Sequence, residues 1–258
     1  MSKLRLRLGM ASDPGKVRTH NEDAVLVNVE LGIAVVADGM GGHRAGDVAS
    51  DLTVRAVAEA FSVEPDSTQS RWMLFRRKLT GQDRLVEAIK RANRIIIETS
   101  RTRPECKGMG TTVVAICLED GVLYQAHVGD SRLYRVREDK LAQLTDDHSL
   151  LNEYLRLGVI KRENAGRFPY KNIIVRALGL SPSVEVDAAA DKPQVGDRYL
   201  LCSDGLTDLV DDETIRAQLA RTKVDVETVA TDLVELALAA GGLDNVTAVV
   251  AEVIAEAT

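Results

Sequence analysis

The sequence predicts an α+β fold in which strands and helices are segregated along the chain. Two groups of apolar strand segments are each followed by a pair of helical segments, and a last strand closes the sequence. Because strand and helix do not alternate regularly, a doubly wound parallel sheet is disfavoured. The 258 residues contain no linker or internal repeat, so we expect one domain that covers residues 1–258.

Hydrophobic spacing defines the elements of the first half. Residues 3–12 alternate apolar and charged side chains, and residues 23–38 fit two strands joined by a tight turn, so both segments predict strands. Apolar residues near helical spacing predict two long helices, at 45–61 and 84–101. The segment 62–83 between them is predicted to be a connection with at most one helical turn. Its Trp72–Phe75 stretch could pack against the helix pair or form a partner surface.

The second half is predicted in the same way. Four short strands broken by Gly, Asp and Glu-Asp turns are typical of an antiparallel meander, at 110–120, 121–130, 131–139 and 140–145. A helix, an irregular polar segment and a strand ending in an acidic turn follow, at 148–158, 159–172 and 197–205. Two helices and a last strand complete the chain, at 211–221, 226–241 and 245–254.

Composition and charge exclude several functional classes. Hydrophobic residues make up 45% of the chain and charged residues 28%, which suits a globular protein with a full core. A net charge of −6 and an aromatic content of 3% argue against nucleic-acid binding. The chain shows no apolar run of membrane-spanning length and no signal peptide, so we expect a cytoplasmic protein without a membrane partner. We also expect a monomer. The three widely spaced cysteines predict buried, reduced thiols.

Four aspartates share one sequence context, in which an apolar strand meets a glycine or a turn. They are Asp38, Asp130, Asp204 and Asp244. Each alone is typical of an ordinary turn. Together they are expected to converge, because a sheet gathers its strand ends in space. Clustered carboxylates repel one another, and a divalent cation relieves that repulsion. All-oxygen ligands favour Mg²⁺ or Mn²⁺, and the spacing of Cys and His residues that zinc requires is absent.

The glycine-rich run after Asp38 raises a choice between a phosphate-binding loop and a metal platform. The run GMGGH lacks the lysine of a P-loop and the spacing of a dinucleotide-binding motif. Gly39 instead lets the backbone approach closely enough for its carbonyl to join a metal's ligands. Upstream, Arg18 suits a bidentate clamp on a phosphoryl group, although pairing with Glu22 is an equal alternative.

Taken together, these segments resemble one known family. The motifs VRTHNED, ADGMGGHRAGDVAS, GMGTTVVAICL, VGDSRLYRVR, LTDDHSL, IIVRALG, LLCSDGLTD and GGLDNVTAVV occur in the family's order across residues 8–253. They are similar to those of the metal-dependent type 2C (PPM) serine/threonine protein phosphatases in their compact bacterial form. The resemblance implies a four-layer α-β-β-α sandwich, two antiparallel sheets flanked by antiparallel helix pairs, with a variable flap at about 146–178.

The resemblance also implies roles for individual residues. The cofactors would be two Mn²⁺ or Mg²⁺ ions and a third, weaker one. Their ligands would be Asp38 as the bridge, Gly39 through its carbonyl, Asp204 and Asp244 at the first ion, Glu22 and Asp23 at the second, and Asp130 with Asp204 at the third. Arg18 would bind the phosphate, and His43 would be the general acid. We expect Asn245 and Thr247 to order the loop of Asp244, and His127 to be a packed, hydrogen-bonded residue.

The implied reaction is direct hydrolysis of phosphoserine and phosphothreonine by a hydroxide that bridges the two metals, without a phosphoenzyme. The implied partners are phosphorylated proteins, including a bacterial serine/threonine kinase. Two alternatives stay open at this point. A regulatory relative without metals would have lost metal-binding aspartates, and here each is present; a phosphatase for small phosphate esters would share the chemistry and differ only around the cleft.

Overall fold

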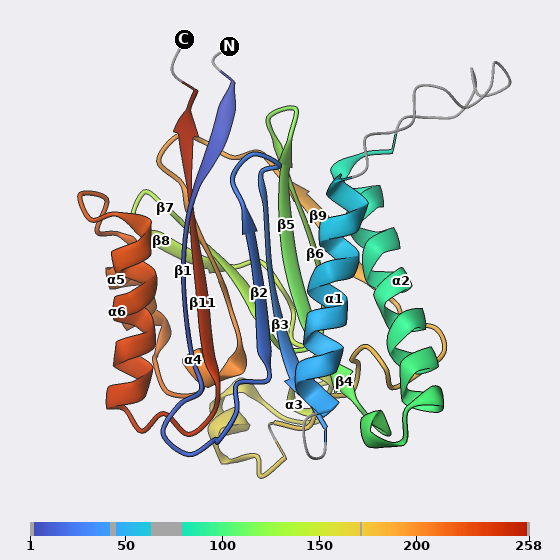
Figure 1. Ribbon diagram of the computed structural model, residues 1–258. Helices are drawn as coiled ribbons and strands as arrows, with labels where there is room; N and C mark the ends of the chain where they lie inside the picture. Colours follow the sequence, from blue (N-terminus) through green and yellow to red (C-terminus); the bar gives the residue numbers. More distant parts are fainter. Residues whose placement is uncertain (1–2, 42–44, 63–78, 171, 257–258) are drawn as a thin grey trace, which may run out of the picture.

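Two antiparallel sheets stack face to face and a pair of helices covers the outer face of each (Figure 1). The structure is a computed structural model that describes residues 3–41, 45–62, 79–170 and 172–256. The four-layer α+β sandwich implied by the resemblance is confirmed. Within the described ranges, no helix is both long enough and apolar enough to cross a membrane.

The two sheets are built from strands distant in sequence. One sheet has the order β1-β11-β10-β7-β8, with bounds Leu4–Asp13, Val246–Ala255, Arg198–Cys202, Arg132–Arg137 and Lys140–Gln143. The other has the order β2-β3-β5-β6-β9, with bounds Asp23–Asn28, Ile33–Met40, Val113–Glu119, Val122–Val128 and Asp187–Asp191; β4 (Gly110–Thr111) pairs with the end of β3. The paired strands are antiparallel throughout, so strand ends from both sheets can meet at one end of the sandwich.

The helices form an outer layer on each side. On the sheet that contains β3 lie α1 (Ala45–Ser62) and α2 (Gly81–Thr102). On the sheet that contains β11 lie α5 (Asp212–Leu219) and α6 (Val226–Ala239). The short helices η1 (Pro104–Cys106), α3 (Leu150–Arg156), η2 (Arg162–Arg167) and α4 (Asp204–Thr207) lie in the connections.

Three buried clusters hold the layers together. A central one lies between the sheets and includes Val36, Leu133 and Val249, contributed by both of them. The outer two lie between each sheet and its helix pair. The strands of the inner layers are therefore apolar on both faces, which explains why β5 and β11 are almost continuously apolar rather than alternating.

The structure corrects four predictions about the elements. The four strands from 110 to 145 are not one meander, because β5 and β6 lie in one sheet and β7 and β8 in the other. Helix α2 begins at Gly81, because Thr80 and Asp83 form a capping box that the pattern did not reveal. Asp204 begins a helix rather than a turn. Strand β9 was not predicted, because its sequence DAAAD has low strand propensity and relies on pairing with β6.

We expect Ile89→Ala in α2 to destabilise the protein by about 2–5 kcal/mol, because this fully buried side chain fills the layer between α2 and its sheet. Urea denaturation in the presence of a chelator measures the change. Arg94→Ala, an exposed position on the same helix, is the control and should alter the unfolding free energy by less than about 0.5 kcal/mol. Equal effects of the two substitutions would contradict the layer assignment.

Candidate active site

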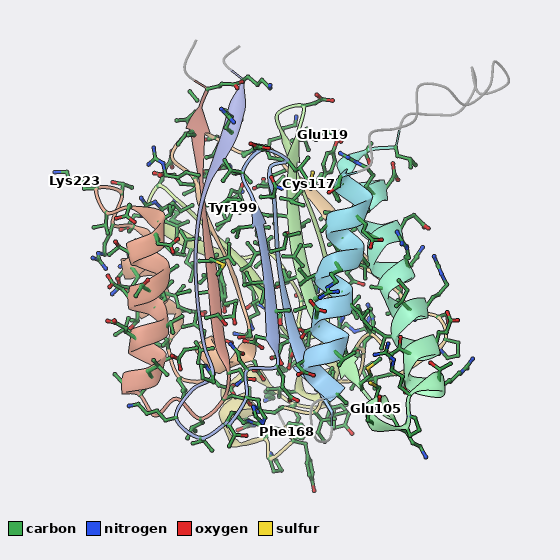
Figure 2. The ribbon with its side chains drawn as sticks, in the orientation of Figure 1. Glu105, Cys117, Glu119, Phe168, Tyr199 and Lys223 are labelled. Atoms are coloured by element: carbon green, nitrogen blue, oxygen red, sulfur yellow. The ribbon has the colours of Figure 1, made fainter. Side chains whose placement is uncertain are left out.

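The predicted metal-binding acids lie at one end of the sandwich, although they come from both sheets. Asp23 begins β2 and Asp38 lies near the end of β3, in one sheet. Asp204 follows β10 and Asp244 precedes β11, in the other sheet. Asp130 lies in the connection from β6 to β7, where the chain crosses between the sheets. Figure 2 shows Phe168 of the flap (residues 146–178) at one end of the molecule, opposite the end that carries Glu119.

Asp38 occupies the centre of this group. Its backbone is fixed by the end of β4 and the residue that follows: the Asp38 carbonyl accepts from the Thr112 amide at 2.9 Å and from the Thr111 hydroxyl at 2.8 Å. Burial, and then the charges of Asp23, Asp204 and Asp130, raise the pKa of Asp38 well above its ordinary value. The structure therefore brings Asp23, Asp130 and Asp204 together around Asp38.

Asp23 is held in place by two hydroxyl groups. Its Oδ2 accepts from Thr247 at 2.6 Å and from Ser203 at 2.9 Å, while its Oδ1 is buried without a hydrogen-bond partner. Burial raises the pKa of Asp23 to about 7, against the lowering effect of the two hydroxyls. Sequence reasoning missed Ser203, whose only signal was its position before Asp204. It also misassigned Thr247, which orients Asp23 rather than the loop of Asp244.

Asp130 and Asp204 complete the buried group. Asp130 is 8% exposed, and its Oδ1 is buried without a hydrogen-bond partner. Burial, and then the charges of Asp204 and Asp147, raise the pKa of Asp130 to about 7. Burial and the nearby Asp208 also raise the pKa of Asp204. The protein thus gathers carboxyl groups that favour their neutral form at this end of the sheets.

This arrangement fits divalent cations. Buried carboxylate oxygens without a hydrogen-bond partner, here on Asp23 and Asp130, are costly unless a cation or water satisfies them. Carboxylate and carbonyl oxygens are the ligands that Mg²⁺ and Mn²⁺ favour. A bound cation would also restore the ionised form of acids whose pKa is raised by burial and by one another. The residues present are therefore suited to a site for hard metal ions.

Glycine is required where β3 meets α1. A Cβ on Gly39 would lie 2.2 Å from the Gly46 carbonyl oxygen and 2.5 Å from that of Glu22. The carboxylate of Glu22, which precedes β2 in the chain, lies against the N-terminus of α1 and accepts from the Gly46 amide. Burial, followed by Asp47, raises the pKa of Glu22. The glycines thus allow close packing of backbones and place Glu22 at the helix N-terminus, a favourable position for an anion.

Arg18 pairs with Asp244 at the edge of the acidic group. Arg18 Nη2 donates to Asp244 Oδ2 at 2.7 Å, and this ion pair raises the pKa of the guanidinium. Asn245 fixes the adjacent loop: its amide nitrogen donates to the carbonyls of Pro14 and His20, and its oxygen accepts from the Glu22 amide. The alternative pairing of Arg18 with Glu22 is not the one found, although Glu22 contributes to the pKa of Arg18.

A second cluster of ligand-type side chains lies beside this site. His127 and His148 stack with their ring centroids 4.7 Å apart, and His148 Nε2 lies 3.4 Å from Asp187 Oδ2. His127 is buried and bonds the Asp146 carbonyl, as predicted. Arg176 bonds both Asp187 and His148 through Nη1, so a guanidinium already supplies the positive charge there. His148 also anchors the flap, because it accepts from the Gly129 amide at 3.0 Å.

Two predicted features lie outside the described residues. They are His43, the proposed general acid, and the stretch from Trp72 to Phe75. Arg132, two residues after Asp130, makes a bidentate pair with Asp147 and donates to the Tyr134 hydroxyl. Arg132 therefore joins β7 to Asp147, and its charge partly offsets the effect of burial on the pKa of Asp130.

Comparison with known proteins finds similarity to phosphatases in both sequence and structure. The family model for protein phosphatase 2C matches residues 16–239. The serine/threonine phosphatase Stp of Listeria monocytogenes is 40% identical over 247 residues, which are 93% of each chain. PstP of Mycobacterium tuberculosis is 40% identical over 254 residues, 97% of this chain and 46% of that protein. The crystal structure of that phosphatase has a TM-score of 0.85 at 39% identity and covers 98% of this chain and 100% of its own.

A further structure, described as the PstP catalytic domain with two manganese ions, has a TM-score of 0.83 at 39% identity, with coverage of 98% and 100%.

The raised pKa values predict how the stability of the metal-free protein depends on pH. Asp130 has a pKa of about 7 when folded and an ordinary value near 4 when unfolded, so between these values the folded state binds more protons. Its contribution therefore destabilises the fold as pH rises from about 4 to about 7, with a slope of up to ~1.4 kcal/mol per pH unit.

Urea denaturation with chelator, repeated across that range, measures the slope. Asp130→Asn should become progressively more stable than wild type as pH rises, whereas Asp51→Asn, on the outer helix α1, should keep the wild-type slope. A constant difference between Asp130→Asn and wild type would show that Asp130 does not titrate in this way.

Proposed function

The chain belongs to the protein phosphatase 2C family of serine/threonine phosphatases, and from this premise we propose that its converging carboxylates form a metal-dependent active site for phosphoserine and phosphothreonine in proteins. The observation that carries the proposal is the meeting of Asp23, Asp38, Asp130 and Asp204 at one end of two sheets, with pKa values raised by burial. The manganese ions described for the related PstP domain support Mn²⁺ as a cofactor.

The resemblance to the family assigns each acid to a cation. We assign Asp38 to bridge two catalytic ions. Asp204, Asp244 and the Gly39 carbonyl would hold the first ion, and Glu22 and Asp23 the second. Asp130 with Asp204 would hold a third, weaker ion. When bound, Mn²⁺ or Mg²⁺ would lower the pKa of a coordinated water and neutralise charge on the phosphoryl oxygens.

The remaining steps belong to the protein's own side chains. Water adds to phosphorus as the bond to the serine or threonine oxygen breaks, and the leaving oxygen needs a proton. His43 is proposed to supply it. Arg18 is proposed to bind the phosphoryl oxygens and to compensate the charge that develops there; its ion pair with Asp244, at the edge of the acidic group, supports this role. Ser203 and Thr247 position Asp23, and Asn245 positions the backbone of Glu22.

A covalent phosphocysteine intermediate is disfavoured by the environment of the thiols. Cys106, Cys117 and Cys202 are all buried, and burial raises the pKa values of Cys117 and Cys202 to about 12. The thiolate form that acts as a nucleophile is therefore scarce at neutral pH. Direct attack by water is the alternative that the site supports.

The partners and the domain follow from the same proposal. We propose that the substrates are phosphorylated proteins, among them a serine/threonine kinase, and that the chain acts as a monomer. We also propose that residues 1–258 form a single catalytic domain whose flap, residues 146–178, borders the cleft. The shared core between the sheets supports the single domain.

Purified protein should hydrolyse a phosphothreonine peptide with Mn²⁺ and lose that activity with chelator. Asp38→Asn should lower turnover by at least about 100-fold, because it removes the charge at the centre of the group. Asp51→Asn, a matched change on the outside of α1, should leave the rate within about twofold. Hydrolysis of small aryl phosphates with no release of phosphate from phosphopeptides would contradict a protein substrate and favour small esters.

We expect His43→Ala to slow hydrolysis of a phosphothreonine peptide by ~10²–10⁴-fold, because the alkoxide that leaves needs a proton. An aryl phosphate, whose leaving group is far more acidic, should be affected much less. Metal affinity, measured by calorimetry with Mn²⁺, should not change. Equal rate losses on both substrates, or none on the peptide, would show that His43 is not the general acid.

A further inference from the structure

A buried threonine lies opposite the proposed bridging aspartate. Thr112, from the motif GMGTT, fills the one-residue gap between β4 and β5. Gly39 of β3 pairs with Thr111 of β4, and the same register continues from β3 to β5. Thr112 therefore faces Asp38 across the sheet. Its side chain is fully buried and takes no part in the reaction described above.

At Thr112 a side-chain hydroxyl takes the place of a backbone carbonyl in the sheet. Two opposed residues of an antiparallel ladder can exchange two N–H···O=C bonds. Here the Thr112 amide donates to the Asp38 carbonyl at 2.9 Å, but the Asp38 amide donates to Thr112 Oγ1 at 3.1 Å. The Thr112 carbonyl accepts instead from the Thr111 hydroxyl at 2.9 Å. The position of the Asp38 peptide therefore depends on a side chain as well as on the ladder.

The same hydroxyl reaches the turn that carries Asp130. Thr112 Oγ1 lies 2.7 Å from Ser131 Oγ, and the two side chains are 0% and 1% exposed. A hydroxyl has one proton and two lone pairs, so this bond is compatible with the one from the Asp38 amide. The threonine also packs against Gly129, where a Cβ would lie 2.6 Å from Thr112 Cβ and Cγ2. One side chain thus bonds the Asp38 backbone on one side and the residue after Asp130 on the other.

We propose that Thr112 is a positioning residue that fixes Asp38 and Asp130 relative to each other, and through them the bridged pair of cations and the third cation. The inference rests on the proposed metal-dependent active site and identifies what holds its two parts in place. Carboxylates on separate segments bind neighbouring ions well only when their backbones are fixed, because metal–oxygen distances tolerate little error. Thr112 acts through these aspartates and is assigned no contact with a cation.

The test is Mn²⁺ binding to the whole chain, measured by calorimetry well below the unfolding temperature. Thr112→Val keeps the volume of the side chain but removes the hydroxyl, so the Asp38 amide and the Ser131 hydroxyl lose this partner. We expect the affinity for Mn²⁺ to fall by about tenfold at the tight sites and at the weak site. Thr112→Ser keeps the hydroxyl and should bind Mn²⁺ within about twofold of wild type.

Two further variants separate positioning from stability. Ser131→Ala removes only the bond toward Asp130, so we expect it to lower affinity at the weak site by about fivefold and to leave the tight sites unchanged. Thr53→Val is the control, because it also removes the hydroxyl of a fully buried threonine, which bonds the Ala49 carbonyl within α1. It should lower stability in urea without changing the affinity for Mn²⁺.

The outcomes also distinguish this inference from the site on which it rests. Wild-type protein that binds no Mn²⁺ contradicts the proposed active site. Unchanged affinity in Thr112→Val overturns the inference alone, and so does an equal loss in Thr112→Ser, because packing of the methyl group would then be responsible. If Thr112→Val does not fold, Ser131→Ala decides the matter, since wild-type affinity at its weak site would overturn the proposal.

Discussion

Mutual repulsion among buried carboxylates is the main physical constraint on the end of the sandwich where the acidic residues meet. Asp38 lies within reach of the charges of Asp23, Asp204 and Asp130, and all four have raised pKa values. A fold holds such a group only if its packing elsewhere is strong enough to offset the cost. Here the three buried apolar clusters offset this cost, and a bound cation would remove most of the repulsion between the carboxylates. The need for metal is thus a property of the fold as well as of the chemistry.

The surrounding polar residues fix the orientation of the carboxylates in this group. Ser203 and Thr247 direct one oxygen of Asp23, which leaves the other without a hydrogen-bond partner within the site. Asn245 joins the loop of Arg18 and Glu22 to the start of β11, so that residues distant in sequence keep a fixed relation. Close packing of Gly39 on Gly46 brings the start of α1 against the same group. Orientation here comes mainly from hydroxyl and amide groups, which hold the acids and their loops without adding negative charge.

The flap is attached to the same framework. His148 bonds the turn that precedes Asp130, and Arg176 joins His148 to Asp187 of β9. Asn172 reaches the loop after β10 through Asp208. The flap is therefore connected to both sheets, close to the acids that each sheet contributes.

Much of the fold and of the acidic site was predictable from the sequence, because both depend on local patterns. Alternation, helical spacing and Asp-Gly junctions identify most elements and the aspartates at strand ends, and the motif order identifies the family. Other features depend on contacts between distant segments. The sequence could not place β5 with β6 and β7 with β8 in different sheets, since the intervening turn resembles an ordinary hairpin. Nor could it reveal β9, the roles of Ser203 and Thr247, or the pairing of Arg18 with Asp244. By itself, the sequence determined which residue types are available for metal and phosphate chemistry; the tertiary structure decided which of them meet, because only packing of two sheets brings their charges within reach of one another.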